Sequence, residues 1–535
     1  MHRFAIVLAL FVPGIAMAQD GDVNSGAWSL LAPFVAIGAA VISRRVVPSL
    51  ALGVVVAALV AAAGAPLVAL QSVGALLVGA ATDLGHLQVA LFTLTVAATV
   101  GLLTASEAMR AMVERIEGLA RNRRGAMVVS WLAGGVIFFD DYANCLVVGN
   151  TMQSVVDRFK VSRAKLAYIV DATAAPVASL AVVSTWVAFQ VDEIGKGLAS
   201  QDLDSGGAFA IFLASVPYSF YCWFTLVFVG AIAITGRDFG PMFRAEQAAM
   251  RTEHTVDDSK SSVPAWIAPI TIVVLVATTF VVMLTTGLNG LGDDAAGARL
   301  FEIIGAADAY IAMVAGGLVA LVVAVFLVVL TRVVTLQAIP ASMWVGVKPV
   351  LHALVILLLA WTLSAGIAAT GTGGYLETLV TGNLATHWLP AVSFLVAAIT
   401  AFATGSSFSA MGILVPVVVS IAIAVTGDAM SGVALACTAS ILSGACLGDH
   451  ASPISDTTVL SSIGSGVDLV THVRTQLPYV LCVGAVSVFV GYIPAGFGVS
   501  PLLLLPLGGV ICVGIVMGVG RVPTAAPAEL LASSS

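Results

Sequence analysis

Two adjacent carboxylates lie inside an otherwise apolar stretch of the chain. Asp140 and Asp141 follow the run Gly134-Gly135-Val136-Ile137-Phe138-Phe139 and precede Tyr142-Ala143-Asn144. An ionised carboxylate at the middle of a bilayer costs about 2.5–3.5 kcal/mol on insertion scales, so a pair of them requires compensation, and a cation is the simplest partner. The glycines and Asn144 allow the backbone to leave helical geometry, which frees carbonyl oxygens that suit Na+.

A second polar stretch, Gly448 to Thr458, carries two carboxylates, an imidazole and four hydroxyls around a proline. Its candidate residues are Asp449, His450, Ser452, Pro453, Ser455, Asp456 and Thr457. A lone histidine in an apolar run is more often a satisfied core residue. Beside Asp449, however, we interpret His450 as a proton relay, because the ordinary pKa of imidazole lies near neutrality.

Buried carboxylates hold protons more tightly than exposed ones, so both acidic pairs could bind either a proton or Na+. We therefore expect Na+ at Asp140, Asp141, Asp449 and Asp456. Competition between the two cations for one site is sufficient for antiport.

Other oxygen donors lie in two further segments. The first contains Asp171, Thr173, Pro176, Ser184 and Thr185, and the second contains Thr404, Ser406 and Ser407 around Gly405. We expect Pro176 and Pro453 to break their helices, because proline lacks the N–H that the helical ladder needs. Single Ser and Thr residues are more often ordinary helix-packing residues, and Asp171 could simply pair with Lys165 or Arg163.

The elements that must position these residues are apolar and long. The chain has 535 residues, of which 59% are hydrophobic and 10% charged, and this composition excludes a soluble protein. A span of about 20 apolar residues crosses the hydrocarbon core as a helix. The predicted spans, about 11 in all, are 28–43, 46–64, 86–104, 164–190, 208–234, 263–287, 308–331, 349–370, 430–456, 477–497 and 500–519.

The distribution of basic residues orients these spans. The Arg110 to Arg124, Arg158 to Lys165 and Arg237 to Lys260 segments favour the cytoplasm. We place the acidic connections 192–204 and 293–308 outside and interpret 66–82 as an interfacial segment. Residues 126–157 must then enter and leave the membrane from the cytoplasmic side. Residues 387–426 must enter and leave it from the outside.

The fold class predicted is therefore an all-α polytopic membrane protein with two re-entrant helical hairpins in an inverted repeat. From the N-terminus, the predicted units are a signal peptide over 1–18, the first repeat over 28–235 and a cytoplasmic loop over 236–262. The second repeat over 263–497, an extra helix over 500–519 and a tail over 520–535 follow. The alternative for the N-terminus is an uncleaved first helix.

At these motifs the chain resembles the NhaC-type Na+/H+ antiporter family of the ion transporter superfamily. The family's FDDYAN motif matches Phe139 to Asn144, its long segment ending in TAAPVA matches Asp157 to Ala178, and its STW matches Ser184 to Trp186. FATG(T/S)S matches Phe402 to Ser407, and GDHxSPISDTT matches Gly448 to Thr458. The chain departs from the family at Ala172, Phe408 and Gln153-Ser154-Val155, where Ser, Trp and a proline are common.

The resemblance implies a secondary transporter in the bacterial cytoplasmic membrane, surrounded by lipid, with Na+ and H+ as its transported ions. It also implies a homodimer with an elevator-like transport domain. Some members of this family exchange malate and lactate with Na+ and H+. An organic-acid exchanger is therefore the alternative function.

Other classes fit less well. A channel would need a continuous polar lining, and the sequence lacks the GxGD and GxSG motifs of intramembrane proteases. We expect no cofactor and no nucleic-acid partner, and we interpret the six cysteines as core residues because they show no CxxC spacing.

Overall fold

The computed structural model describes residues 26–43, 45–201, 203, 207–251, 261–292, 297–298, 300–371, 385–453 and 455–524. Within these ranges the chain is helical, and its only β-type pairing is an isolated bridge between Asp238 and Arg521. Nine described helices are long and apolar enough to cross a membrane, or up to 11 if each of two bent pairs counts as one span. The predicted all-α membrane architecture is confirmed. The predicted signal peptide, 1–18, lies outside the described residues.

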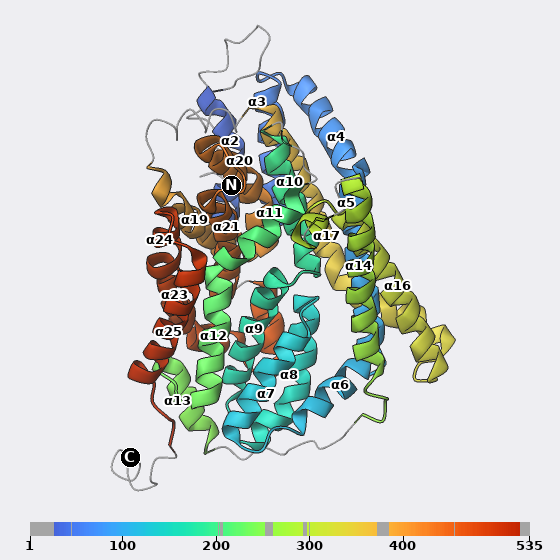
Figure 1. Ribbon diagram of the computed structural model, residues 1–535, viewed down its shortest axis with the longest axis vertical. Helices are drawn as coiled ribbons and strands as arrows, with labels where there is room; N and C mark the ends of the chain where they lie inside the picture. The colour runs from blue at the N-terminus through green and yellow to red at the C-terminus, as the bar shows by residue number, and fades with distance from the viewer. Residues whose placement is uncertain are drawn as a thin grey trace.

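A set of long apolar helices, here called the framework helices, packs together along one side of the molecule (Figure 1). They are α2 (Leu31–Ser43), α3 (Val46–Ala61), α4 (Pro66–Thr82), α5 (Leu84–Ala105), α14 (Ile267–Leu291), α16 (Ala309–Leu330) and α17 (Ile339–Ala369). Large apolar side chains on the outer faces of α14 and α16, such as Val273, Val322 and Phe326, are exposed. Such faces suit lipid, because hydrocarbon is as apolar as they are.

Each half of the chain contains a helical hairpin followed by a broken helix. In the first half these are α7 (Arg123–Val136) with α8 (Asp141–Arg158), then α9 (Arg163–Leu180) with α10 (Thr185–Ala199). In the second half they are α19 (Leu389–Thr404) with α20 (Ser407–Thr426), then α21 (Gly432–Ala451) with α22 (Asp456–Ser465).

The two hairpins lie at opposite ends of the molecule, α7–α8 at the lower end and α19–α20 at the upper end of Figure 1. The second segment of each broken helix contacts the hairpin of the other half, since α10 packs on α20 and α22 packs on α8. This exchange brings all four chain breaks into the interior of the bundle.

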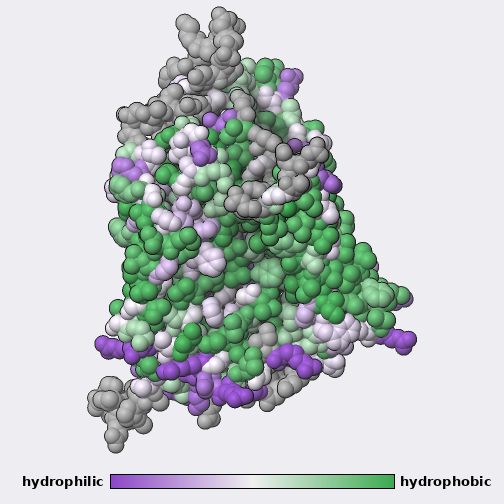
Figure 2. All heavy atoms as spheres, in the orientation of Figure 1, coloured by the Kyte–Doolittle hydropathy of each residue, from purple (hydrophilic) through white to green (hydrophobic). Residues whose placement is uncertain are grey.

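The remaining helices complete the bundle around these breaks. They are α6 (Ala108–Glu117), α11 (Ala208–Ser215), α12 (Phe220–Thr235), α13 (Gly240–Ala249), α15 (Leu300–Gly305), α23 (Leu469–Val486), α24 (Ile493–Gly496) and α25 (Pro501–Val519). The short turns are η2 (Gly26–Leu30), η4 (Val216–Tyr218), η6 (Leu336–Ala338), η7 (Thr386–Trp388) and η8 (Ser487–Tyr492). Figure 2 shows a hydrophobic belt across the middle of the molecule and hydrophilic residues gathered at its lower end.

The helix break predicted at Pro176 is wrong in position. Pro176 lies inside α9, which continues to Leu180 and meets α10 at an angle of 47°. The break falls at 181–184, where the hydroxyl of Ser184 accepts a hydrogen bond from Val187 N at 3.1 Å and so caps α10. Pro176 removes one backbone N–H donor from α9 without ending the helix. The Ser184 cap instead supplies an acceptor for a backbone N–H in the first turn of a new helix. Pro453 does lie in the break between α21 and α22.

Residues 66–82, predicted as an interfacial segment, form the continuous helix α4, with Pro66 in the first turn, where a proline costs no hydrogen bond. The predicted outer connection 192–204 is helical up to Ala199, and Asp192 and Glu193 are buried. Lys196 lies one turn further along α10 and pairs with both carboxylates, which makes their burial possible. The predicted loop 236–262 contains α13.

Candidate ion-binding site

The tip of the α7–α8 hairpin is held by the first predicted carboxylate. Asp140 caps α8, accepting a hydrogen bond from Ala143 N at 2.8 Å through Oδ1. Its Oδ2 accepts a longer one, 3.5 Å, from the hydroxyl of Thr185, whose backbone N–H donates to Phe139 O at 3.1 Å. The hairpin tip is therefore tied to the first residue of α10.

Asn144 keeps the turn open one helical turn into α8. Its Nδ2 donates to the carbonyl oxygens of Gly134 (2.6 Å), Ile137 (3.0 Å) and Thr173 (3.3 Å). Its Oδ1 is buried and has no hydrogen-bond partner. The amide N–H groups thus donate to the backbone, and the amide oxygen has no partner inside the protein. A bound cation or a protonated acid could use this oxygen as its acceptor.

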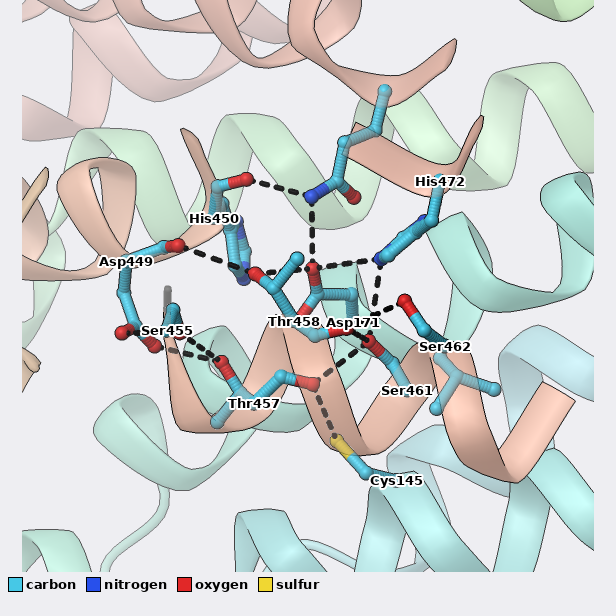
Figure 3. Close-up of polar contacts among 12 residues, drawn as sticks. Cys145, Asp171, Asp449, His450, Ser455, Thr457, Thr458, Ser461, Ser462 and His472 are labelled. Atoms are coloured by element: carbon cyan, nitrogen blue, oxygen red, sulfur yellow. Dashed lines mark hydrogen bonds and ion pairs between the residues drawn. The ribbon is translucent and has the colours of Figure 1, made fainter. Parts of the chain in front are cut away.

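The α21–α22 break contributes the second carboxylate site. Asp449, near the end of α21, accepts hydrogen bonds from Ser455 Oγ at 2.6 Å and Thr457 Oγ1 at 2.7 Å (Figure 3). Asp141 lies at the start of α8, which packs on α22, and it is buried like Asp140 and Asp449. Each half of the chain therefore places a buried carboxylate at a chain break in the interior.

Asp171 lies at the centre of a third polar group, which Figure 3 shows between His472 and Thr458. Its Oδ2 accepts from Gln476 Nε2 at 3.0 Å and lies 3.3 Å from both Thr458 Oγ1 and His472 Nε2, while its Oδ1 is buried without a partner. The expected partners are elsewhere: Arg163 pairs with Asp157 at 2.8 Å, and the ammonium of Lys165 pairs with Asp238.

His450 does not form the predicted relay with Asp449. Its Nδ1 is hydrogen-bonded to Tyr221 OH at 3.0 Å, and its carbonyl oxygen accepts from Gln476 Nε2 at 2.6 Å. Consecutive residues near a helix end project in different directions, so the imidazole of His450 turns toward Tyr221 while Asp449 turns toward α22. The backbone carbonyl of His450, and not its ring, joins the Asp171 group through Gln476.

The hydroxyls predicted at the α19–α20 turn are occupied by local backbone contacts. Thr404 Oγ1 donates to Ala401 O at 3.3 Å, Ser406 Oγ caps α20 by accepting from Ser409 N at 3.4 Å, and Ser407 Oγ donates to Ala445 O at 3.1 Å. Thr173 Oγ1 likewise donates to Ile169 O at 2.8 Å. The hydroxyls of this turn shape it rather than join the carboxylates.

The four carboxylates expected to share Na+ do not form one group. Asp456 is exposed in the first turn of α22, where it accepts a hydrogen bond from Tyr142 OH at 3.2 Å, whereas Asp140, Asp141 and Asp449 are buried. Among the described residues, no three or more His, Cys, Asp or Glu side chains are grouped so as to hold a metal ion. Ser452 is buried at the break between α21 and α22.

His472 and Gln476 are site residues that sequence reasoning missed. They lie on α23, which starts at Leu469, eight residues before the predicted span that began at 477. Their spacing of four residues, continued by Tyr479, places three polar side chains on one helical face. That spacing is the signal that would have found them.

Comparisons with known proteins place the chain among transporters. It is 34% identical over 492 residues to an uncharacterized protein of Haemophilus influenzae, covering 90% of this chain and 93% of that one. The solved YdaH transporter of Alcanivorax borkumensis has a similar fold, with a TM-score of 0.56 and 18% identity over 85% of this chain and 90% of its own. MtrF of Neisseria gonorrhoeae, described as illuminating a class of antimetabolite efflux pumps, has a TM-score of 0.50 and 14% identity over 80% and 83%.

The apolar spans define a multi-pass membrane protein whose fold resembles those of the solved neighbours, and the family match given next makes it a secondary transporter. Residues 177–497 match the Na+/H+ antiporter family, and the chain belongs to that family.

Proposed function

We propose that this protein exchanges Na+ for H+ across the bacterial cytoplasmic membrane, with the two ions competing for Asp141 and Asp449. The observation that carries the proposal is the burial of these two carboxylates, one from each half of the chain, without an ion pair to Lys or Arg among the described residues. Like charges in a buried site cannot all remain ionised without a counter-charge, so the site must hold a proton or a cation.

The described part of the protein supplies no such counter-charge. Within it, no Lys or Arg forms an ion pair with Asp140, Asp141 or Asp449, whereas other buried carboxylates such as Asp238 and Glu246 are paired with Lys165 and Arg123. An exchangeable cation is therefore the partner that we propose for Asp141 and Asp449.

The surrounding oxygens are those that Na+ prefers. A hard cation takes carboxylate, hydroxyl, amide and carbonyl oxygens. Asn144 Oδ1 is buried and unpaired at the hairpin tip, and the hydroxyls of Thr185 and Thr457 already contact Asp140 and Asp449. Replacing the hydrogen bond of a protonated acid by a Na+ contact converts the proton-loaded site into the Na+-loaded one.

Everted membrane vesicles from cells that express the protein test the proposal. After acidification by respiration, addition of Na+ should release protons and restore the fluorescence of a pH-sensitive dye. The control is vesicles that carry the Asp141→Asn variant, which should show no response to Na+.

The alternative function is Na+- or H+-coupled exchange of an organic acid. In that case the dye would respond to Na+ only when malate or lactate is also present, and this result would replace the ion-exchange proposal.

A further inference from the structure

A second group of ionisable side chains, two of them buried and three partly buried, lies between α10 and the framework helices. Asp192, Glu193 and Lys196 come from α10, His86 from α5 and Tyr310 from α16. Asp192 is seven residues beyond Thr185, which places the group about 10 Å along the helix axis from the carboxylate site. The group is therefore separate from the proposed exchange site.

Asp192 lies beside an ammonium, an imidazole and a phenol. Its Oδ2 is 2.7 Å from the Lys196 ammonium, an ion pair without hydrogen-bonding geometry, and 3.8 Å from His86 Nε2, and its Oδ1 accepts a hydrogen bond from Tyr310 OH at 3.2 Å. His86 Nδ1 donates to the carbonyl oxygen of Ala80 at 2.7 Å, and its ring stacks on Trp361 with a centroid separation of 4.1 Å. Both contacts fix the imidazole with Nε2 toward Asp192.

Glu193 has the same Lys196 ammonium as its one hydrogen-bond donor among the described residues. It is fully buried, and its Oε1 accepts that hydrogen bond at 2.7 Å. Its Oε2 has no hydrogen-bond partner, and the neighbouring indole N–H of Trp361 is unpartnered as well. The carboxylate therefore shares one cation with Asp192 and leaves one oxygen unsatisfied.

The group carries more negative than positive charge. With a neutral His86, two carboxylates and one ammonium leave a single surplus negative charge. A third acid, Asp83, also faces the group, with its Oδ1 3.8 Å from His86 Nδ1, and its side chain is half exposed. As a carboxylate it cannot neutralise the surplus negative charge. A buried carboxylate without full compensation costs several kcal/mol, which a single bound proton removes.

We propose that Glu193 is a second proton-binding site, which holds a proton on Oε2 in the folded protein. Asp192 stays ionised beside the Lys196 ammonium, which balances its charge, and Tyr310 OH, which donates to it. The neutral His86 holds its proton on Nδ1, so its Nε2 donates nothing to Asp192. Loss of the proton places a net negative charge between α10 and the framework helices α5 and α16. The proposal does not depend on the exchange reaction.

The test measures thermal unfolding of the purified full-length protein in detergent from neutral to alkaline pH. A glutamate in the unfolded chain is ionised at these pH values, so unfolding releases the proton and the stability of the wild type falls as pH rises. Glu193→Gln imitates the protonated residue and should reduce the release by about one proton, flattening the decline. Asp192→Asn should flatten it too, because Lys196 then balances Glu193 alone.

Glu107→Gln, which changes an exposed carboxylate in the connection between α5 and α6, is the matched control and should keep the wild-type decline. Infrared difference spectra between neutral and alkaline pH give a second readout. The wild type and Glu107→Gln should lose a carboxylic-acid C=O band that Glu193→Gln lacks from the start. Unchanged slopes in both Glu193→Gln and Asp192→Asn, or the same titrating band in wild type and Glu193→Gln, would overturn the proposal.

Discussion

Asp449 and Asp456 are seven residues apart in one motif, yet they differ in burial and in hydrogen bonding. Asp449 is buried and accepts hydroxyl hydrogen bonds of 2.6 and 2.7 Å, whereas Asp456 is exposed and accepts one bond from Tyr142 at 3.2 Å. A buried acid with two hydroxyl donors can exchange a proton for a cation while keeping the same neighbours. An exposed acid has water as a competing ligand.

Asp449→Asn should therefore abolish Na+/H+ exchange while the protein stays folded in the membrane, because the amide keeps the shape but cannot carry the charge. Asp456→Asn is the paired control and should leave most of the exchange activity. Both are measured with the dye assay in everted vesicles. Wild-type Na+ affinity in Asp449→Asn would remove this residue from the site.

The Asp171 group makes a prediction about stability. His472→Ala removes one partner of a fully buried carboxylate and should lower the free energy of unfolding by about 1–3 kcal/mol, since Gln476 and Thr458 remain. The cost should shrink in the Asp171→Asn background. Thermal unfolding in detergent gives both values, with His352→Ala on the exposed face of α17 as the control. Equal costs in the two backgrounds would mean that the contact contributes nothing.

At the scale of elements, the hairpin depends on a close approach of α7 to α9. A methyl group at Gly134 would meet Thr173 Oγ1 at 2.0 Å, whereas a methyl group at the adjacent Gly135 would meet nothing within 4 Å. Gly134→Ala should cost about 1–3 kcal/mol of stability by overpacking. Gly135→Ala should be neutral or stabilise by up to about 1 kcal/mol, because alanine favours the helix.

The comparison uses thermal unfolding of both variants together with their exchange rates. Gly134→Ala should also slow exchange, because it pushes α7 from the carbonyl of Thr173 to which Asn144 donates. Equal stability of the two variants would show that the close approach is unimportant.

The two hairpins were predicted from the placement of charge: basic residues flank 126–157 at both ends, whereas neither flank of 387–426 carries positive charge. These segments correspond to α7–α8 and α19–α20. Sequence reasoning misplaced the break of the first half, since the proline at 176 is visible in the sequence, whereas the cap that Ser184 gives to α10 depends on the turn before it. It also assigned Asp192 and Glu193 to a loop, because the pairing with Lys196 that permits their burial becomes evident only once the segment is known to be helical.

At the scale of the whole molecule, the inverted arrangement brings residues of distant segments together. The acidic motifs near 140 and 449 were predicted to face each other across the repeat, and Asp141 and Asp449 are both buried, with α22 packed on α8. Which acids meet could not be predicted, because it depends on the crossing of α22 onto α8, and that crossing turns Asp456 outward to Tyr142. The partners of Asp171 come from α23, whose start was not recognised in the sequence.

The central claim is that Na+ and H+ compete for one site, and radioactive Na+ binding to the purified protein at a series of pH values tests it most directly. If one Na+ displaces one proton, the apparent affinity should weaken by about tenfold for each unit of pH decrease in the range where the site is protonated. Asp449→Asn should bind little Na+ at any pH. A Na+ affinity that does not change with pH in the wild type would contradict the account.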